Sequence, residues 1–73
     1  MNSMKYAVII EEGPNNYSAY VPDLPGCVST GETYDEVLRN IHEAIDGHLS
    51  VMREHGDPIP PAISQAACVD VGV

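Results

Sequence analysis

The sequence is poor in positive charge. Lys5, Arg39 and Arg53 stand against eleven acidic residues, which gives a formal net charge of −8 over 73 residues. Because neutralisation of phosphates needs clustered Lys and Arg, this balance argues against direct DNA or RNA binding by the chain. It fits a basic protein partner through electrostatic complementarity, and it fits equally a small domain whose acidity keeps it soluble.

Cysteine and long apolar runs are also scarce. Cys27 and Cys68 form no C-x-x-C pair, and no signal-like apolar leader precedes the first predicted strand. These features predict a cytoplasmic protein with free thiols. No apolar run approaches the length that crosses a membrane. Neither cysteine has a basic cluster nearby that would lower its thiol pKa, and no G-x-S-x-G motif is present, so nucleophilic catalysis has no support.

The three histidines do not have the spacing of a metal site. His48 and His55 lie seven residues apart, roughly 10 Å along a helix, whereas zinc binds nitrogen at about 2 Å. His42 points about 120° away from His48. We therefore expect neither a metal nor a cofactor. His48 lies in an apolar stripe, either as a half-buried histidine or as a partner contact, and Gly47 either fills an exposed helix position or permits close approach of another chain.

Residues 1–73 are expected to form a single domain near the lower size limit for a stable core, so oligomerisation or a bound partner would help to stabilise it. Strands are predicted at 5–12, 17–22 and 27–30, from their β-branched and aromatic residues. The first has apolar residues on both faces, which indicates a central strand, and the turn residues "GPNN" after it predict a hairpin. The third is short enough for an edge strand.

The period of the apolar residues then changes from two to 3.6 and predicts one long amphipathic helix over 33–55. Thr33 and Glu36 form a capping-box signature at its start, and Gly56 ends it. Residues 65–71 are predicted to form a fourth strand after a right-handed crossover. The predicted fold class is therefore α+β, in the order β-β-β-α-β, with a four-stranded sheet of strand order 3-2-1-4 that the helix covers on one face.

The loop "PDLPG", residues 22–26, is predicted to be stiff, because its two prolines fix φ and its glycine adopts φ values that other residues avoid. Asp23 either caps its own turn by accepting backbone hydrogen bonds or is presented to a partner. In the second interpretation, Leu24 and nearby tyrosines such as Tyr20 form a rigid recognition knob.

The segment "YSAYVPDLPGCVSTGETYDEVLRNIHEAIDGHL", residues 17–49, resembles the HicB family of antitoxins. In that family, S-A-x-x-P-D-L-P-G-C leads into T-G-x-T-x-x-E at a helix start and then into an N-I-x-E-A-I core. The proline-rich "PIPPA" at 58–62 continues the similarity. Single pieces are weak signals, but the ordered set at these spacings is specific.

The resemblance implies a partial RNase H-like fold, in which a fourth strand lies beside the first and parallel to it. RNase H enzymes hold two metal ions with carboxylates from the first strand, the helix and the fourth strand. The middle of the first strand here is "AVII", residues 7–10, which has no carboxylate to begin such a site. The chain is therefore expected to be a binding scaffold and not an enzyme, and a metal-dependent nuclease is the least favoured alternative.

Members of the HicB family bind a small basic toxin, HicA, which cleaves messenger RNA, and cover its active site. The resemblance thus implies an antitoxin of a type II toxin-antitoxin system, without the C-terminal DNA-binding domain that many members carry. The alternative is an orphan module that self-associates as a homodimer or larger homo-oligomer and has no toxin partner. The expected partner contacts are Tyr20, Asp23, Leu24, Glu36, Glu43 and Asp46.

Overall fold

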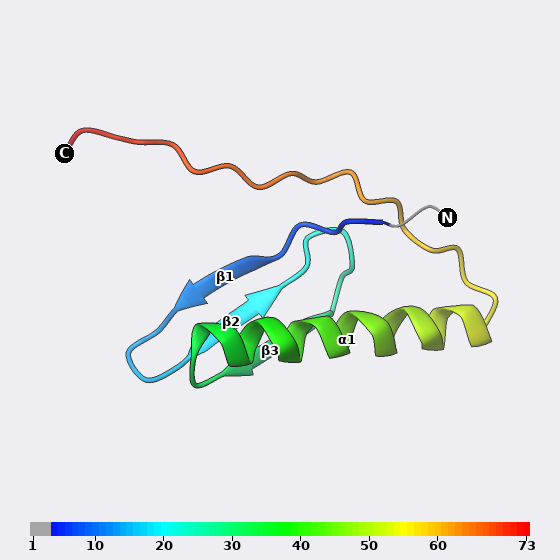
Figure 1. The fold of residues 1–73 in the computed structure, drawn as a ribbon. Coiled ribbons are helices and arrows are strands. Elements are labelled where there is room, and N and C mark those ends of the chain that lie inside the picture. Colours follow the sequence, from blue (N-terminus) through cyan, green and yellow to red (C-terminus); the bar gives the residue numbers. More distant parts are fainter. Residues whose placement is uncertain (1–3) are drawn as a thin grey trace.

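The computed structural model describes residues 4–73 and shows a three-stranded antiparallel sheet with one helix on its face (Figure 1). The strands are β1 (Ile9–Glu12), β2 (Tyr17–Tyr20) and β3 (Val28–Gly31), and the helix is α1 (Tyr34–Glu54). The predicted α+β class and the succession of three strands and a helix are thereby confirmed.

The middle strand of the sheet is β2, because the strand order is β1-β2-β3. The prediction that the first strand is central is therefore not confirmed in the described sheet, whereas β3 lies at an edge as expected. Side chains alternate along β1 and the residues before it. Tyr6, Val8 and Ile10 pack against the core, while Ala7 and Ile9 belong to the other face, where they are half-buried. A strand can therefore have apolar residues on both of its faces and still lie at the edge of a sheet.

A tight hairpin joins β1 to β2. The Gly13 N–H donates a hydrogen bond to the Asn16 carbonyl at 2.8 Å. The register pairs Ile9 with Tyr20, and Tyr20 in turn lies opposite Val28 of β3. Each strand has only four residues, although the first was predicted to begin at residue 5. The sheet is therefore small and leaves much of the helix to be covered by loops.

The helix begins and ends where its capping residues predict. The Thr33 hydroxyl accepts a hydrogen bond from the Glu36 N–H at 3.1 Å, and Gly56, just beyond the helix, has a φ of 71°. At its start, α1 passes very close to β3. A Cβ atom on Gly31 would lie 2.5 Å from the backbone nitrogen of Val37, so this position accepts only glycine without a shift of the backbone.

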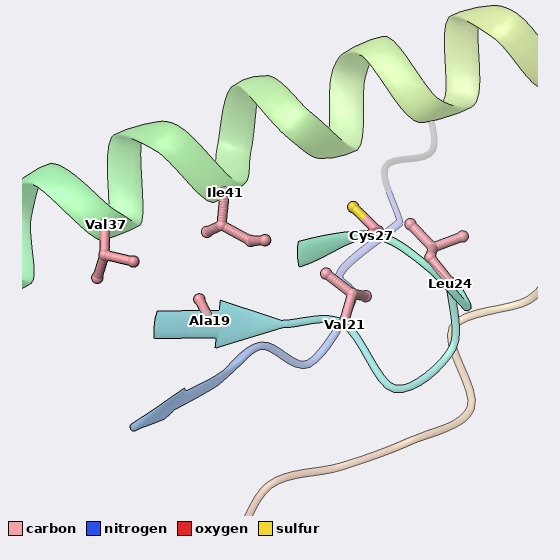
Figure 2. Close-up of a cluster of buried hydrophobic side chains, with 6 residues drawn as sticks. All are labelled: Ala19, Val21, Leu24, Cys27, Val37 and Ile41. Carbon is pink, nitrogen blue, oxygen red and sulfur yellow. The ribbon is translucent and has the colours of Figure 1, made fainter. Parts of the chain in front are cut away.

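The core lies between α1 and the sheet. In residues 4–73 the buried apolar residues are Ala19, Val21, Leu24, Cys27, Val37 and Ile41 (Figure 2). Half of them, Val21, Leu24 and Cys27, come from the loop between β2 and β3 and not from a strand. A core of this size is marginal for an isolated domain.

The predicted fourth strand does not form. Residues 57–73 contain no helix or strand, and residues 65–73, which we call the tail, are exposed and run away from the sheet (Figure 1). A strand exists only where a neighbour satisfies its backbone hydrogen bonds. The spacing of apolar residues indicates only that side chains suit a half-buried surface. The four-stranded order 3-2-1-4 is therefore not confirmed, and β1 has a free outer edge within residues 4–73.

Candidate functional site

The loop between β2 and β3 is held by three backbone hydrogen bonds. The Val21 N–H donates to the Cys27 carbonyl at 3.2 Å, the Leu24 N–H to the Val21 carbonyl at 3.1 Å, and the Cys27 N–H to the Leu24 carbonyl at 3.0 Å. Gly26 has a φ of 83°, which side-chain-bearing residues rarely adopt. The "PDLPG" segment is therefore two successive tight turns that also return the chain to the core.

Leu24 is not a surface knob, and that prediction is wrong. Its side chain is 0% exposed and belongs to the core, where Figure 2 shows it on the same side of the sheet as α1. The turns at 21–27 direct the Leu24 side chain toward the core. The sequence "PDLPG" alone does not predict this direction. Burial of one leucine contributes about 1.5–3 kcal/mol, so Leu24 stabilises the fold and is not available to a partner.

Asp23 binds residues of its own chain. One carboxylate oxygen, Oδ2, accepts hydrogen bonds from the N–H groups of Ile63 at 3.0 Å and Ser64 at 2.9 Å, and Oδ1 accepts one from the Ser64 hydroxyl at 2.7 Å. The Ser64 hydroxyl first, then the Ser64 N–H and more weakly the Ile63 N–H, lower the pKa of Asp23 below 3.8. Asp23 thus caps the segment after α1 and not its own turn, a contact that sequence spacing does not signal.

Tyr6 makes a second contact to the same segment. Its hydroxyl donates a hydrogen bond to the carbonyl of Pro60. Burial, with a contribution from the negative charge of Asp23, raises the pKa of Tyr6 above 10.0. We call the contacts that Tyr6 and Asp23 make with residues 60–64 the connector clamp. It fixes the chain against the sheet just before the tail begins.

Three of the predicted contact residues lie on one side of α1, Glu36, Glu43 and Asp46, and we call them the acidic face. At 100° per residue they lie on the side of α1 away from Val37. Glu43 and Asp46 are exposed, and Glu36 is half-buried because its Oε1 accepts a hydrogen bond from the Glu32 N–H at 3.3 Å. A rigid helix therefore presents this negative charge to solvent.

The acidic face has two neighbours that can carry positive charge: Arg39, which at 100° per residue lies between Asp46 and Glu43 on the same side of α1, and His42 when it is protonated. Asp46 lies 3.6 Å from Nδ1 of His42, and the side chains of the two residues are 70% and 77% exposed. An exposed pair of this kind contributes little to stability, so the carboxylate remains free to bind a partner.

Tyr20 lies on a different surface. Its side chain is 42% exposed, whereas the preceding Ala19 is buried beneath α1. Since successive side chains of a strand point to opposite faces, Tyr20 lies on the face of the sheet that α1 does not cover. The structure therefore separates Tyr20 from the acidic face, and the six predicted contacts do not form one surface.

The remaining candidate residues, the histidines, the cysteines and Gly47, do not form a further site in the described part of the chain. Residues 4–73 contain no group of three or more His, Cys, Asp or Glu side chains placed to hold a metal ion. Cys27 is buried and Cys68 exposed, both as free thiols, and burial raises the pKa of Cys27. His48 is half-buried, and a Cβ atom on Gly47 would meet nothing within 4 Å. Over the same described range, no helix is long and apolar enough to cross a membrane.

Comparison with known proteins identifies relatives over most of the chain. A UPF0150 protein of Helicobacter pylori is 56% identical over 41 residues, which are 56% of this chain and 57% of that protein. A 14.9 kDa protein from the rep-hol intergenic region of Haemophilus phage HP1 is 40% identical over 57 residues, 78% of this chain and 43% of its own. The UPF0150 protein Ta0767 of Thermoplasma acidophilum is 43% identical over 58 residues, 78% of this chain and 84% of its own.

The chain thus spans about half the length of the Helicobacter and phage relatives. No solved structure matches it. A family model described as "HicB_like antitoxin of bacterial toxin-antitoxin system" matches residues 6–70, which include the connector clamp and the acidic face. The chain therefore belongs to the family of HicB-like antitoxins of bacterial toxin-antitoxin systems.

Proposed function

We propose that this chain is an antitoxin that binds a small basic HicA-type toxin and covers the site at which the toxin cleaves messenger RNA. The observation that carries the proposal is the acidic face, which α1 presents to solvent in a chain of net charge −8. A surface that binds RNA phosphates is positively charged, so carboxylates on a rigid helix are complementary to it. Such a toxin and its messenger RNA substrate place the complex in the cytoplasm.

In this proposal the chain masks an enzyme and is not one. The core-facing residues of β1 and of the chain that leads into it are Tyr6, Val8 and Ile10, none of which supplies the carboxylate that an RNase H metal site needs. The chain takes no metal or cofactor and binds neither DNA nor RNA directly. A partial RNase H-like fold remains part of the proposal, because the free edge of β1 is where a fourth strand would be added.

The predicted contacts take separate roles in this proposal. The acidic face contacts the toxin, and Tyr20 becomes a second contact only for a toxin that reaches the uncovered face of the sheet. Asp23 and Leu24 keep the loop and the segment after α1 in place.

The test uses this chain and a small basic toxin of the HicA type, each purified separately. A stable complex at low salt, whose affinity falls as salt is added, and loss of RNA cleavage by the toxin are the expected results. An unrelated basic protein of similar size and charge serves as the control and should bind much more weakly. Absence of a complex at low salt, or full RNA cleavage within the complex, would overturn the proposal.

The second candidate function is a self-associating regulatory module without a toxin. The free edge of β1 and the exposed apolar side chains of the tail favour it, because both are surfaces that proteins usually cover. A homo-oligomer whose mass does not change with salt, together with no effect on any neighbouring basic protein, would support this function over the first.

A further inference from the structure

An apolar groove of about 720 Å³ runs between α1 and the chain leading into β1. Its apolar lining comes from alternate residues of that chain and from one flank of the helix: Met4, Tyr6, Val8, Leu38, Ile45 and Leu49. Four polar residues also line it, Lys5, His42, Asp46 and Arg53, so one residue of the acidic face borders the groove. The groove follows the strand edge that has no neighbour in the described sheet.

The apolar residues of the tail alternate as in a strand with one apolar face, which suits such a groove. Ala67, Val69, Val71 and Val73 occur at every second position, so an extended chain places them on one face, and Asp70 on the other. In the structure this apolar face is unprotected, with Val69 80% and Val71 73% exposed. Contiguous exposed apolar side chains of this kind usually mark an interaction surface.

The tail is also shorter than the chain segment beside which it would lie. Residues 65–71, fully extended, span about 23 Å, and residues 4–12, which lead into and form β1, span about 30 Å. The connector clamp holds residues 60–64 at the sheet, so the start of the tail is fixed. Beyond the clamp the tail leads away from its own sheet (Figure 1), and all of its residues are exposed.

We propose that two copies of this chain exchange tails, so that residues 65–71 of each copy form the fourth strand beside β1 of the other, with Val69 and Val71 in the groove. When both tails are exchanged, the free edge of β1 in each copy gains a hydrogen-bonding neighbour, and the product is a closed two-fold dimer. It also adds apolar side chains to a core that is small for an isolated domain. The dimer goes beyond the proposed function and does not depend on it.

The charge of the chain sets the salt dependence of the dimer. Each copy carries a net charge of −8, so added salt screens the repulsion between copies, while burial of valines is not weakened by it. Dimerisation should therefore persist or strengthen with salt, whereas the toxin complex should weaken. Failure of one proposal is thereby distinguishable from failure of the other.

Light scattering of the purified chain tests the proposal first. The natural chain should have the mass of a dimer, and the double variant Val69→Asp/Val71→Asp should be a monomer with an unchanged circular dichroism spectrum of its helix. The matched control is Val28→Asp/Val51→Asp, which changes two exposed valines outside the tail and groove and should remain dimeric. A monomeric natural chain, or a dimeric Val69→Asp/Val71→Asp variant, would overturn the proposal.

Disulfide trapping then tests the exchange itself. Cys68 and Ala7 both belong to the face away from the groove, so Ala7→Cys or Ile9→Cys should pair with Cys68 across the dimer. A chain with Cys68→Ser and one of these new cysteines is mixed with the natural chain and oxidised, and mass spectrometry should find a bond between the two different chains. A chain with Cys68→Ser alone is the control. A bond formed within one chain that carries both cysteines, or a dimer that neither position traps, would contradict the exchange.

Discussion

Asp23 and Ser64, which are 41 residues apart in the sequence, are joined by two hydrogen bonds: Oδ1 of Asp23 accepts from the Ser64 hydroxyl at 2.7 Å, and Oδ2 accepts from the Ser64 N–H at 2.9 Å. The pair ties the chain after α1 to the loop between β2 and β3. At the other end of the helix, Gly31 of β3 lies close to the backbone of Val37.

The clamp should open in acid. Because the Ser64 hydroxyl and N–H lower the pKa of Asp23 below 3.8, the carboxylate stays charged in the folded chain at pH values where it is protonated in the unfolded chain. Its contribution to the free energy of unfolding is present above pH 3.8 and is lost as the pH falls through the lowered pKa. The protection of the Ile63 and Ser64 amides, measured by NMR as their exchange rate relative to an unstructured peptide at the same pH, should fall in that acid range.

The substitution Asp23→Ala should give the same loss of protection at neutral pH, with little effect on the amides of α1. Asp70→Ala, which removes an exposed carboxylate from the tail, is the control and should leave the exchange of Ile63 and Ser64 unchanged. Continued protection of these two amides in Asp23→Ala would show that the clamp does not hold the connector.

Gly31→Ala should destabilise the fold. The added Cβ would lie 2.5 Å from the Val37 nitrogen and 2.8 Å from its Cα, and these are backbone atoms that cannot move aside as a side chain can. Overpacking of this kind costs about 1–3 kcal/mol, which thermal or urea unfolding would measure. A melting temperature equal to that of the natural chain would contradict the close packing of β3 against α1.

Gly47→Ala is the matched control for the same chemical change. A Cβ atom there meets nothing within 4 Å, and Gly47 lies within α1. Alanine is favoured over glycine in a helix by about 0.8–1.0 kcal/mol, so this variant should unfold at a higher temperature.

Leu24→Ala should cost far more stability than Tyr20→Ala. Leu24 is 0% exposed and Tyr20 is 42% exposed. Truncation of a buried leucine costs about 2–5 kcal/mol, which is a large share of the total stability of a small domain. Chemical unfolding of the two variants gives the comparison, and equal losses would show that the "PDLPG" turns do not bury Leu24.

The sequence predicts well what depends on neighbouring residues. The helix limits follow from Thr33 and Gly56, whose capping chemistry lies within a few residues of the groups they cap. The hairpin at Gly13 and the stiff loop ending at Gly26 are local in the same sense, and the structure has both. The family follows from the ordered motif in 17–49, which the family model confirms.

The sequence does not predict the roles of residues whose contacts lie far away along the chain. Alternation along β1 shows apolar faces but not whether a strand lies on each side, so the sequence does not reveal that β1 lies at an edge of the described sheet. Likewise, the two turns at 21–27 decide that Leu24 points inward, and the partner of Asp23 lies 41 residues away. Residues 65–71 have the composition of a strand but no neighbouring strand within residues 4–73.

The affinity of the HicA-type toxin for a variant of the acidic face, Glu36→Lys/Glu43→Lys/Asp46→Lys, tests the central claim most directly. The matched control is Glu11→Lys/Glu12→Lys/Asp57→Lys, because both sets replace three acidic residues and change the formal net charge from −8 to −2, by two units per reversal. If α1 binds the toxin, calorimetry at low salt should show a loss for the acidic-face variant at least about tenfold, or 1.4 kcal/mol, greater than for the control. Equal losses in the two variants would contradict the claim that this face is the toxin-binding surface.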